Sequence, residues 1–414
     1  MKANAERNHE PLVHLTRRAY MSPWKALGIR AAAVAVALLI SGIIAIVLIE
    51  KLSANPGRIL DFYKCFVDGS FSSSGMVWKF FKNIAILLCI SLAVTPAFRM
   101  KFWNIGAEGQ VLMGMLGSIA VAKGAANLPN WIVLILMLLA GMLSGIVWAI
   151  IPAIFKAFFN TNETLFTLMM NYVATYFVAY MLVVWVPSGN AMGIVNQDTK
   201  VGWLPTVIHN YFLIIVAVFI LTGILFVYLN YTKHGYEISV VGESQKTAKY
   251  IGINVKKVII RTMILSGALC GFAGFLMASG LDHSITTVAV GGQGFTAIMV
   301  SWLANFNPLT MVGTSALIVF LDMGGRQISE TFDVQGALPN VIIGIILFSV
   351  IGCEFFIRYK INFRKKEATA TPQAPAAEAK AAEPEETVQP DENEDSKEQT
   401  SEETTEDSVA KEVN

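Results

Sequence analysis

Long apolar segments alternate with short polar connections along most of the chain. Ten of these segments are long and apolar enough to predict buried helices, many of them close to the roughly 20 residues that cross a hydrocarbon core. They lie at residues 29–49, 83–98, 105–122, 131–155, 165–186, 211–230, 258–280, 295–305, 309–323 and 341–357. The pattern predicts an all-α polytopic membrane protein with about 10 transmembrane helices.

Two of the apolar segments carry features that break a helix. The segment at 295–305 is too short to cross a core of ~30 Å, even when it is extended back to Gly291. The segment at 105–122 begins with Gly106 and Gly109 on either side of the acidic Glu108. Broken or half-spanning helices in two separate places are typical of a transport pathway built from an internal repeat.

Composition and charge agree with a membrane location and suggest an orientation. The chain is 54% hydrophobic and 15% charged, whereas soluble domains have roughly 25% charged residues. Lysine and arginine gather before the first segment, between the sixth and seventh, and after the tenth. Such clusters mark cytoplasmic loops, so both termini are expected in the cytoplasm. The first segment lacks a small-residue cleavage pattern and is expected to be a retained helix rather than a signal peptide.

The chain is expected to have three parts. Residues 1–28 form a cytoplasmic N-terminal segment, residues 29–366 the transmembrane domain, and residues 367–414 an acidic tail. The tail holds 15 of the 30 acidic residues and no aromatic residue. It cannot bury a core and is therefore expected to be disordered, either simply solvated or bound to a partner.

Several kinds of chemistry have no support in the sequence. The four cysteines show no paired spacing and the five histidines are scattered, so neither a disulfide framework nor a metal or cofactor site is expected. The chain also lacks a G-x-x-x-x-G-K-[ST] phosphate loop and a nucleophile–base arrangement. It is therefore expected to be neither an ATPase nor another enzyme. Small-residue pairs predict close helix packing instead, at Gly141/Gly145 and Gly267/Gly271.

Polar residues inside two apolar segments are the candidates for the helix break and the pathway. Burying an ionised carboxylate such as that of Glu108 costs about 2.5–3.5 kcal/mol on insertion scales. A helix N-terminus offsets part of this cost, so Glu108 caps its own helix, pairs with a neighbour, or lies beside the permeation path. Asn171 needs polar partners in mid-segment and either bonds another helix or lines a cavity. Asn104 and Gln110 complete this candidate set.

A polar island at residues 231–257 separates the sixth and seventh apolar segments. Ser244 can cap a short helix, Gln245 to Ile251 can form about two turns, and Gly252 can supply a left-handed stop. So short a helix is not stable alone and must pack on its own membrane domain or on a second protein. The island is therefore either a solvated basic loop or a docking helix.

Four motifs together resemble a known family. They are NIGAEGQVLMG at 104–114, TLMMNYVA at 167–174, GESQKTAKYIGINV at 242–255 and GGQGFTAIMVSWLANFNPL at 291–309. The chain resembles the permease subunits of bacterial ABC importers in the simple-sugar, branched-chain amino-acid and nucleoside group. Within this group it is most similar to the larger of the two permeases of nucleoside importers. The resemblance covers roughly residues 22–366.

The resemblance implies a type II-like permease of the bacterial cell membrane that has no ATP site of its own. It implies a cytoplasmic ABC ATPase that receives a coupling helix, a second permease that completes a heterodimer, and an extracytoplasmic substrate-binding lipoprotein. The implied cargo is a nucleoside, with ribose or another simple sugar as the alternative, and nucleic acid is not an expected partner. The implied coupling residues are Gly242, Glu243, Ala248, Tyr250 and Gly252.

The motifs depart from the family pattern in two places. Ser244-Gln245 stands where relatives commonly have Asn-Pro, which still permits a helix to start. Ala304-Asn305-Phe306 stands where relatives commonly have Gly-Arg-Asn, so no role carries over to Asn305. A nucleoside would also suit base-stacking aromatic residues, for which the sequence offers Phe166, Tyr172, Phe295 and Trp302 without favouring one.

A secondary transporter driven by protons or sodium is the alternative from a different class. It would use Glu108 and Asp322 as ion-coupling carboxylates. It would, however, leave the polar island at 231–257 without a purpose.

Overall fold

The computed structural model describes residues 13–17, 22–49, 52, 54–186, 192–334 and 338–363. Residues 13–362 form a single contact unit. The acidic tail expected at 367–414, and most of the N-terminal segment expected at 1–28, lie outside the described residues.

Almost all of the described chain is helical. The helices are α1 (Pro23–Leu48), α3 (Ile59–Phe71), α4 (Ser74–Arg99), α5 (Ala107–Gly124), α6 (Asn130–Phe159), α7 (Glu163–Trp185), α8 (Phe212–Tyr231), α9 (Lys233–Glu243), α10 (Gln245–Tyr250), α11 (Val255–Met277), α12 (Gln293–Leu303), α13 (Pro308–Phe332) and α14 (Leu338–Arg358). A 3-10 turn, η1 (Pro56–Arg58), precedes α3, and a π-helical turn, η2 (Ala278–Asp282), extends α11. Two strands, β1 (Val13–Arg17) and β2 (Tyr359–Phe363), pair in one small sheet, so the described chain is mostly rather than wholly α-helical.

Each of the ten predicted apolar segments falls on one helix. In the part of the chain that the structure describes, six helices are long and apolar enough to cross a membrane, namely α4, α6, α7, α8, α11 with η2, and α13. α1 and α14 contribute shorter apolar stretches at 32–48 and 340–353. α12 has only 11 residues, or about 16 Å at 1.5 Å per residue, which is half of a hydrocarbon core.

Helices α3 and α9 occupy segments that the sequence pattern left as connections. Charged residues interrupt both, which hides the apolar faces that they bury. α3 buries Phe62 and Phe66, and α9 buries Ile238 and Val241. Both are amphipathic and pack one side on the membrane helices.

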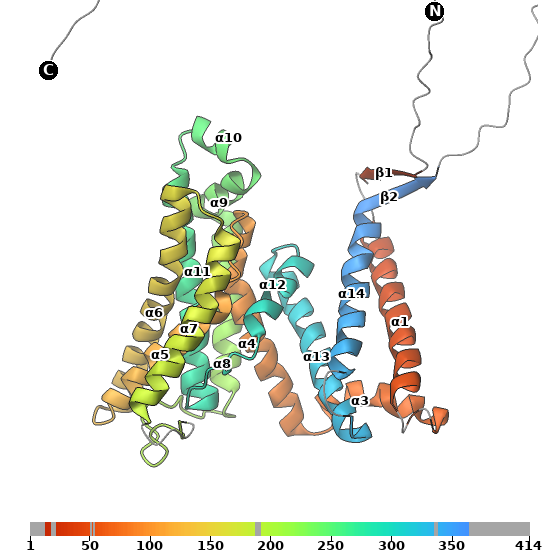
Figure 1. The fold of residues 1–414 in the computed structure, drawn as a ribbon, viewed down its shortest axis with the longest axis horizontal. Helices are drawn as coiled ribbons and strands as arrows, with labels where there is room; N and C mark the ends of the chain where they lie inside the picture. The colour runs from red at the N-terminus through yellow and green to blue at the C-terminus, as the bar shows by residue number, and fades with distance from the viewer. Residues whose placement is uncertain are drawn as a thin grey trace, which may run out of the picture. The chain divides into compact units, whose positions relative to one another are not determined.

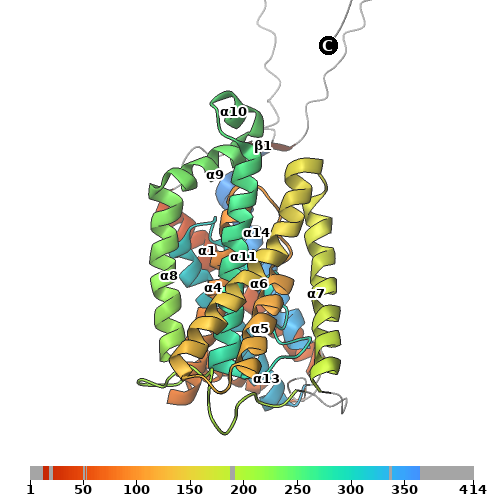
Figure 2. The same ribbon diagram turned by 90° about the vertical axis from the view of Figure 1, so that its left-hand side faces the viewer.

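The largest hydrophobic cluster lies among α4, α5, α6 and α11. Figure 2 shows α5, α6 and α11 next to one another. Glycines let these helices approach closely. A Cβ atom on Gly145 would collide with the carbonyl oxygen of Gly267, and one on Gly271 with that of Gly141. The close packing predicted from these small residues is confirmed.

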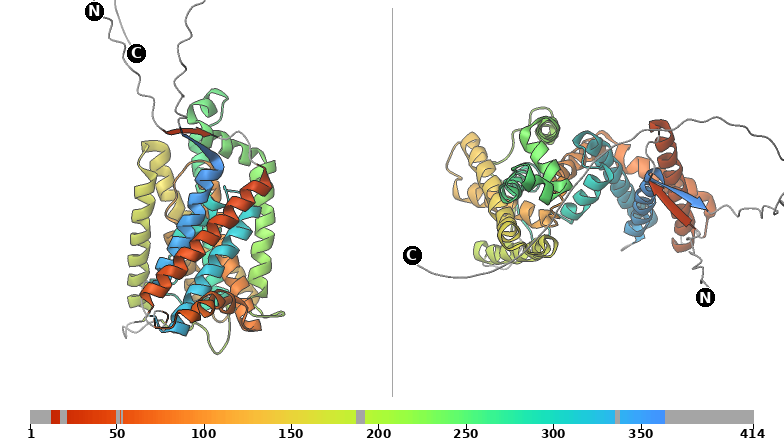
Figure 3. Two further views of the ribbon diagram at one scale, coloured as in Figure 1. Left: turned by 90° about the vertical axis from the view of Figure 1, so that its right-hand side faces the viewer. Right: turned by 90° about the horizontal axis from the view of Figure 1, so that it is seen from above.

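A second hydrophobic cluster joins α1, α3, α13 and α14. Its largest fully buried side chains include Phe62 and Phe332. α1 crosses α14 on the side shown at the left of Figure 3, and α3 packs along α13. A Cβ atom at Gly324 would collide with the ring of Phe66, so a glycine is needed where α3 and α13 meet.

The short helix α10 lies at the same end of the unit as the start of α1 and the end of α14 (Figure 1). α3 lies at the opposite end.

Candidate functional site

The carboxylate of Glu108 joins the two broken helices. Glu108 lies in the first turn of α5, and its Oε1 accepts a hydrogen bond of 2.8 Å from the backbone N–H of Gly292. Its Oε2 accepts a second bond, of 2.7 Å, from the N–H of Gly294. These N–H groups belong to the start of α12, where the backbone has no partner within the helix. Glu108 therefore pairs with a neighbouring helix and does not cap its own.

Glycine is required at this junction because of backbone conformation and close approach. Gly291 and Gly292 have φ of +64° and +79°, a left-handed region that L-residues with a side chain rarely enter. A Cβ atom on Gly294 would lie 2.5 Å from the backbone nitrogen of Glu108. The start of α12 thus fits against the start of α5 only when these positions carry no side chain.

The amides of Asn104 and Gln110 form a reciprocal pair just before and inside α5. Asn104 Nδ2 donates to Gln110 Oε1 at 3.2 Å, and Gln110 Nε2 donates to Asn104 Oδ1 at 3.1 Å. Asn104 also donates to Ser266 Oγ on α11 and accepts from the N–H of Gly106. Both amides are buried. The pair closes the loop into α5 and fixes it to α11.

Two polar residues of α7 hold the other side of the same loop. Asn171 Nδ2 donates to the carbonyl oxygen of Ile105, and its Oδ1 accepts from the N–H of Gly109, both at 2.9 Å. Thr167 Oγ1 accepts from the N–H of Ile105 at 3.2 Å. α7 thus supplies hydrogen bonds that the interrupted helix lacks.

The structure brings the four predicted residues Asn104, Glu108, Gln110 and Asn171 together around one helix break. We call this set, with Gly292 and Gly294, the break junction. The polar atoms of its side chains are bonded within the protein, so in this conformation they hold backbone. Sequence reasoning did not single out Thr167 or Ser266, for which the only signal was a small polar residue in an apolar segment.

An aromatic cluster lies next to the break junction. The ring centroids of Trp103, which precedes the junction, and Trp302, on α12, are 5.2 Å apart. Phe98 packs against Trp103, and Phe306 against Trp302. Both indoles keep exposed surface, 40% for Trp103 and 51% for Trp302.

The other aromatic candidates and the second carboxylate lie in different surroundings. Phe166 packs on Phe155 at 4.9 Å between ring centroids. Tyr172 is exposed on α7. Asp322 Oδ2 accepts a bond of 2.8 Å from Arg326 one turn along α13, so it has a local counter-ion.

The polar island folds as the sequence predicts, with an additional helix before it. Ser244 Oγ accepts from the N–H of Thr247 and caps α10, which ends at Tyr250. Gly252 has φ +83°, and the N–H of Ile253 bonds back to the carbonyl of Ala248. These are the N-cap and left-handed stop of a short helix.

The short helix rests on its own membrane domain and presents its other side outward. Ala248 is fully buried in the large hydrophobic cluster. Tyr250 is 91% exposed, and Glu243 and Ile251 are exposed as well. Although Ala248 and Ile251 are three residues apart, they do not share a buried face, because α10 ends at Tyr250 and Ile251 is exposed.

Gly242 ties the island to the end of α4. A Cβ atom at Gly242 would collide with the carbonyl oxygen of Arg99, the last residue of α4. Arg99 in turn donates to the carbonyl of Leu229 and to Asn230 Oδ1, both at 3.2 Å. The chain continues from Arg99 directly to Trp103 and the break junction.

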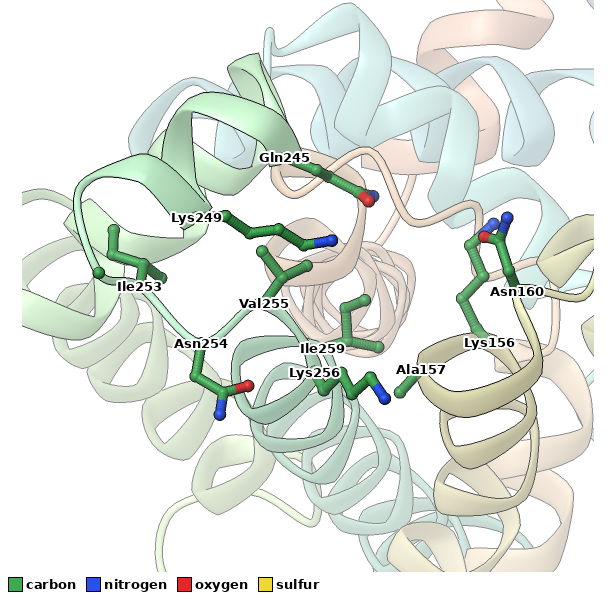
Figure 4. A pocket seen from close by; sticks show the side chains of 11 residues that line it. Lys156, Ala157, Asn160, Gln245, Lys249, Ile253, Asn254, Val255, Lys256 and Ile259 are labelled. Carbon is green, nitrogen blue, oxygen red and sulfur yellow. The ribbon is translucent and has the colours of Figure 1, made fainter. Parts of the chain in front are cut away.

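A basic hollow lies beside the polar island. A cavity of about 680 Å³ separates the α10–α11 connection from the end of α6 (Figure 4). Lys156, Lys249 and Lys256 line it. Lys156 is paired at 2.7 Å with Glu163. Lys249 and Lys256 add positive charge to the rim of this hollow.

On the other side of the same connection, Glu237 of α9 is paired with Arg261 of α11. Arg261 Nη2 donates to Glu237 Oε2 at 2.7 Å. This hydrogen bond is the main reason that the pKa of Glu237 lies below its ordinary value. The pair ties α9 to the first turns of α11.

Comparisons with known proteins agree on one class. The family model described as branched-chain amino acid transport system / permease component matches residues 76–351. A glucose ABC transporter permease protein of Haloferax volcanii is 26% identical, over 84% of this chain and 93% of its own. A guanosine ABC transporter permease protein of Bacillus subtilis is 27% identical, over 74% and 89%. A nucleoside ABC transporter permease protein of Lactococcus lactis is 23% identical, over 70% and 80%.

Proposed function

This chain belongs to the family of branched-chain amino acid transport system permease components, and we propose that the cargo it carries is a nucleoside. It is a multi-pass membrane permease of an ABC transporter and not an enzyme, and such a permease works with an ATPase and a substrate-binding protein. Two relatives that match most of the chain are named for guanosine and nucleoside transport. The glucose-transporter relative keeps a simple sugar as the second candidate.

The geometry of α10 is the observation that carries the coupling part of the proposal. A helix of six residues is capped, stopped by glycine and anchored through Ala248, yet it leaves Tyr250 almost fully exposed. A solvated loop needs neither the cap nor the anchor. The coupling residues are Gly242, Glu243, Ala248, Tyr250 and Gly252, and the ATPase takes the exposed side.

The coupling movement passes from α10 to the break junction through α4. When nucleotide closes the ATPase, α9 and α10 move together because Ser244 caps one helix at the end of the other. Gly242 touches the backbone of Arg99 without a side chain between them, so α4 follows. The next residues lead to Asn104 and to Glu108, which holds the start of α12. Asn104, Glu108, Gln110 and Asn171 thus act on the path by positioning backbone.

The remaining parts of the proposal concern topology and assembly. α10 and both termini are cytoplasmic, about 10 segments of residues 29–366 lie in the membrane in a type II-like arrangement, and α12 crosses only half of it. Residues 1–28 and 367–414 flank that domain on the cytoplasmic side. A second permease completes a heterodimer, and a substrate-binding lipoprotein delivers cargo at the opposite face.

Uptake of labelled guanosine and ribose by cells that lack other carriers tests the cargo. We expect guanosine to accumulate when the permeases, the ATPase and the binding protein are all present. Accumulation of ribose without guanosine would refute the nucleoside assignment.

A Tyr250→Ala variant tests coupling in the same cells. Uptake should fall at least several-fold, because the variant loses the exposed ring that is proposed to contact the ATPase. The amount of permease in the membrane should stay normal, because Tyr250 is almost fully exposed in this chain. Tyr176→Ala, another exposed tyrosine (74%) on α7, is the matched control. Equal uptake by the two variants would contradict the coupling role.

A further inference from the structure

The half-length helix α12 exposes one continuous apolar stripe. Phe295, Met299 and Trp302 follow one another at i, i+4 and i+7, the spacing of one helix face, and are 43%, 37% and 51% exposed. The opposite face of α12 is buried through Gly294, Ala297, Val300 and Ser301. The stripe begins one residue after the N–H group that Glu108 holds.

Trp103 extends the stripe beyond the helix. Its ring lies 5.2 Å from that of Trp302 and tilts by 39°. Phe306 and Phe98 stack against each other behind the two indoles, which limits how the indoles can turn. The exposed faces of Trp103 and Trp302 thus form a supported aromatic surface, here called the indole shelf.

The backbone around the shelf argues against lipid as its neighbour. α12 is followed by Asn305 and Phe306 in left-handed conformations, φ 51° and 57°, and preceded by Gly291 and Gly292 in the same region. Non-helical backbone at membrane depth is tolerated only where protein buries it or it lines a water-filled cavity. α12 packs on α4, α5 and α13, and its exposed stripe is the side that these helices leave uncovered.

We propose that Trp302 and Trp103 stack the base of a nucleoside as it passes the break junction. This inference rests on the proposed function, since it concerns how the same path receives its cargo. Aromatic side chains stack on any base because every base has a π face, without reading its hydrogen-bonding edge. A shelf of this kind suits a permease that receives a substrate already selected by a binding protein. Among the candidate stacking residues Phe166, Tyr172, Phe295 and Trp302, this proposal favours Trp302 on α12.

Uptake by the complete transporter tests the shelf. Trp302→Ala should lower the maximal rate of guanosine uptake about tenfold, in line with the loss of one stacking contact. The concentration for half-maximal uptake should stay the same, because the binding protein sets it. Trp302→Phe should restore most of the rate. The maximal rate of uridine uptake should fall less in Trp302→Ala than that of guanosine uptake, since a pyrimidine offers a smaller ring for stacking.

Trp131→Ala is the matched control, because Trp131 is exposed (65%) at the start of α6. Photolysis of 8-azidoguanosine during turnover provides a direct readout and should label peptides that contain Trp103 or Trp302. Equal rates for the Trp302→Ala and Trp131→Ala variants, or labelling confined to other helices, would overturn the shelf while nucleoside import stands. Loss of the second permease on purification of Trp302→Ala would assign the stripe to the heterodimer interface instead. Absence of nucleoside uptake by the unaltered transporter would overturn both proposals.

Discussion

Replacing Glu108 by glutamine tests whether its carboxylate holds the start of α12. Glutamine keeps the length and shape of the side chain but offers one acceptor oxygen where the carboxylate offers two. Its NH₂ group would face either the N–H of Gly292 or that of Gly294, two donors that now receive bonds of 2.8 and 2.7 Å. The substitution therefore removes at least one hydrogen bond and leaves two donors facing each other.

The size of the expected change in the free energy of unfolding follows from the charge of Glu108 and from its hydrogen bonds. A hydrogen bond to a charged group contributes about 1.5–3 kcal/mol, and an unpaired buried donor costs about 1–3 kcal/mol. The neutral amide avoids the cost of burying a charge, which offsets part of this loss. We therefore expect Glu108→Gln to lower the free energy of unfolding by about 1–3 kcal/mol. We also expect it to slow uptake relative to the unaltered transporter, because α12 is held less firmly to α5.

Unfolding in detergent, followed by intrinsic fluorescence during titration with a denaturing detergent, measures the stability change. Glu330→Gln is the control, since Glu330 is exposed near the end of α13. Uptake of labelled guanosine measures the functional effect. The reasoning is refuted if Glu108→Gln and Glu330→Gln unfold at the same point and transport at the same rate.

Two further predictions concern the polar island at residues 231–257 and its contacts with α4 and α11. Gly242→Ala should strongly reduce uptake while the protein still reaches the membrane, because the added methyl group would push against the Arg99 carbonyl. Gly252→Ala is the control, since a Cβ atom there meets nothing within 4 Å and adds only left-handed backbone strain of about 1–2 kcal/mol. The control should retain more uptake activity, and a milder effect of Gly242→Ala than of Gly252→Ala would contradict the contact with Arg99. The ion pair of Glu237 and Arg261 should stabilise the fold at pH values above the ordinary glutamate pKa of about 4.3. This stability should be lost as the pH falls through the lowered pKa of Glu237. Between pH 7 and pH 3 the melting temperature should therefore drop less for Arg261→Met than for the unaltered protein, and parallel curves for the two proteins would disprove the contribution of the pair.

The short helix α10 could be predicted from sequence because everything that defines it is local. Its cap lies three residues from the N–H group that it binds, and its glycine stop follows directly. The ten apolar segments were likewise recognisable from hydropathy, each falling on one helix. Helices α3 and α9 were not, because charged residues along them conceal the faces that they bury.

The break junction could be located from sequence but not assembled. Glycine and glutamate inside apolar segments showed where helices break, yet the partner of Glu108 lies 184 residues further along the chain. Nothing in a single sequence pairs those two positions. The contact between Gly242 and Arg99 is hidden for the same reason, since a glycine reveals that space is short without showing what fills it.

Reconstitution of the permease pair and ATPase in proteoliposomes, with binding protein on the delivery side, tests the central claim most directly. Labelled guanosine should accumulate only while ATP is hydrolysed on the side of α10, and dissipating proton and sodium gradients should not change the rate. Guanosine uptake that follows an ion gradient without the ATPase, or ATP-driven uptake of ribose alone, would contradict the account.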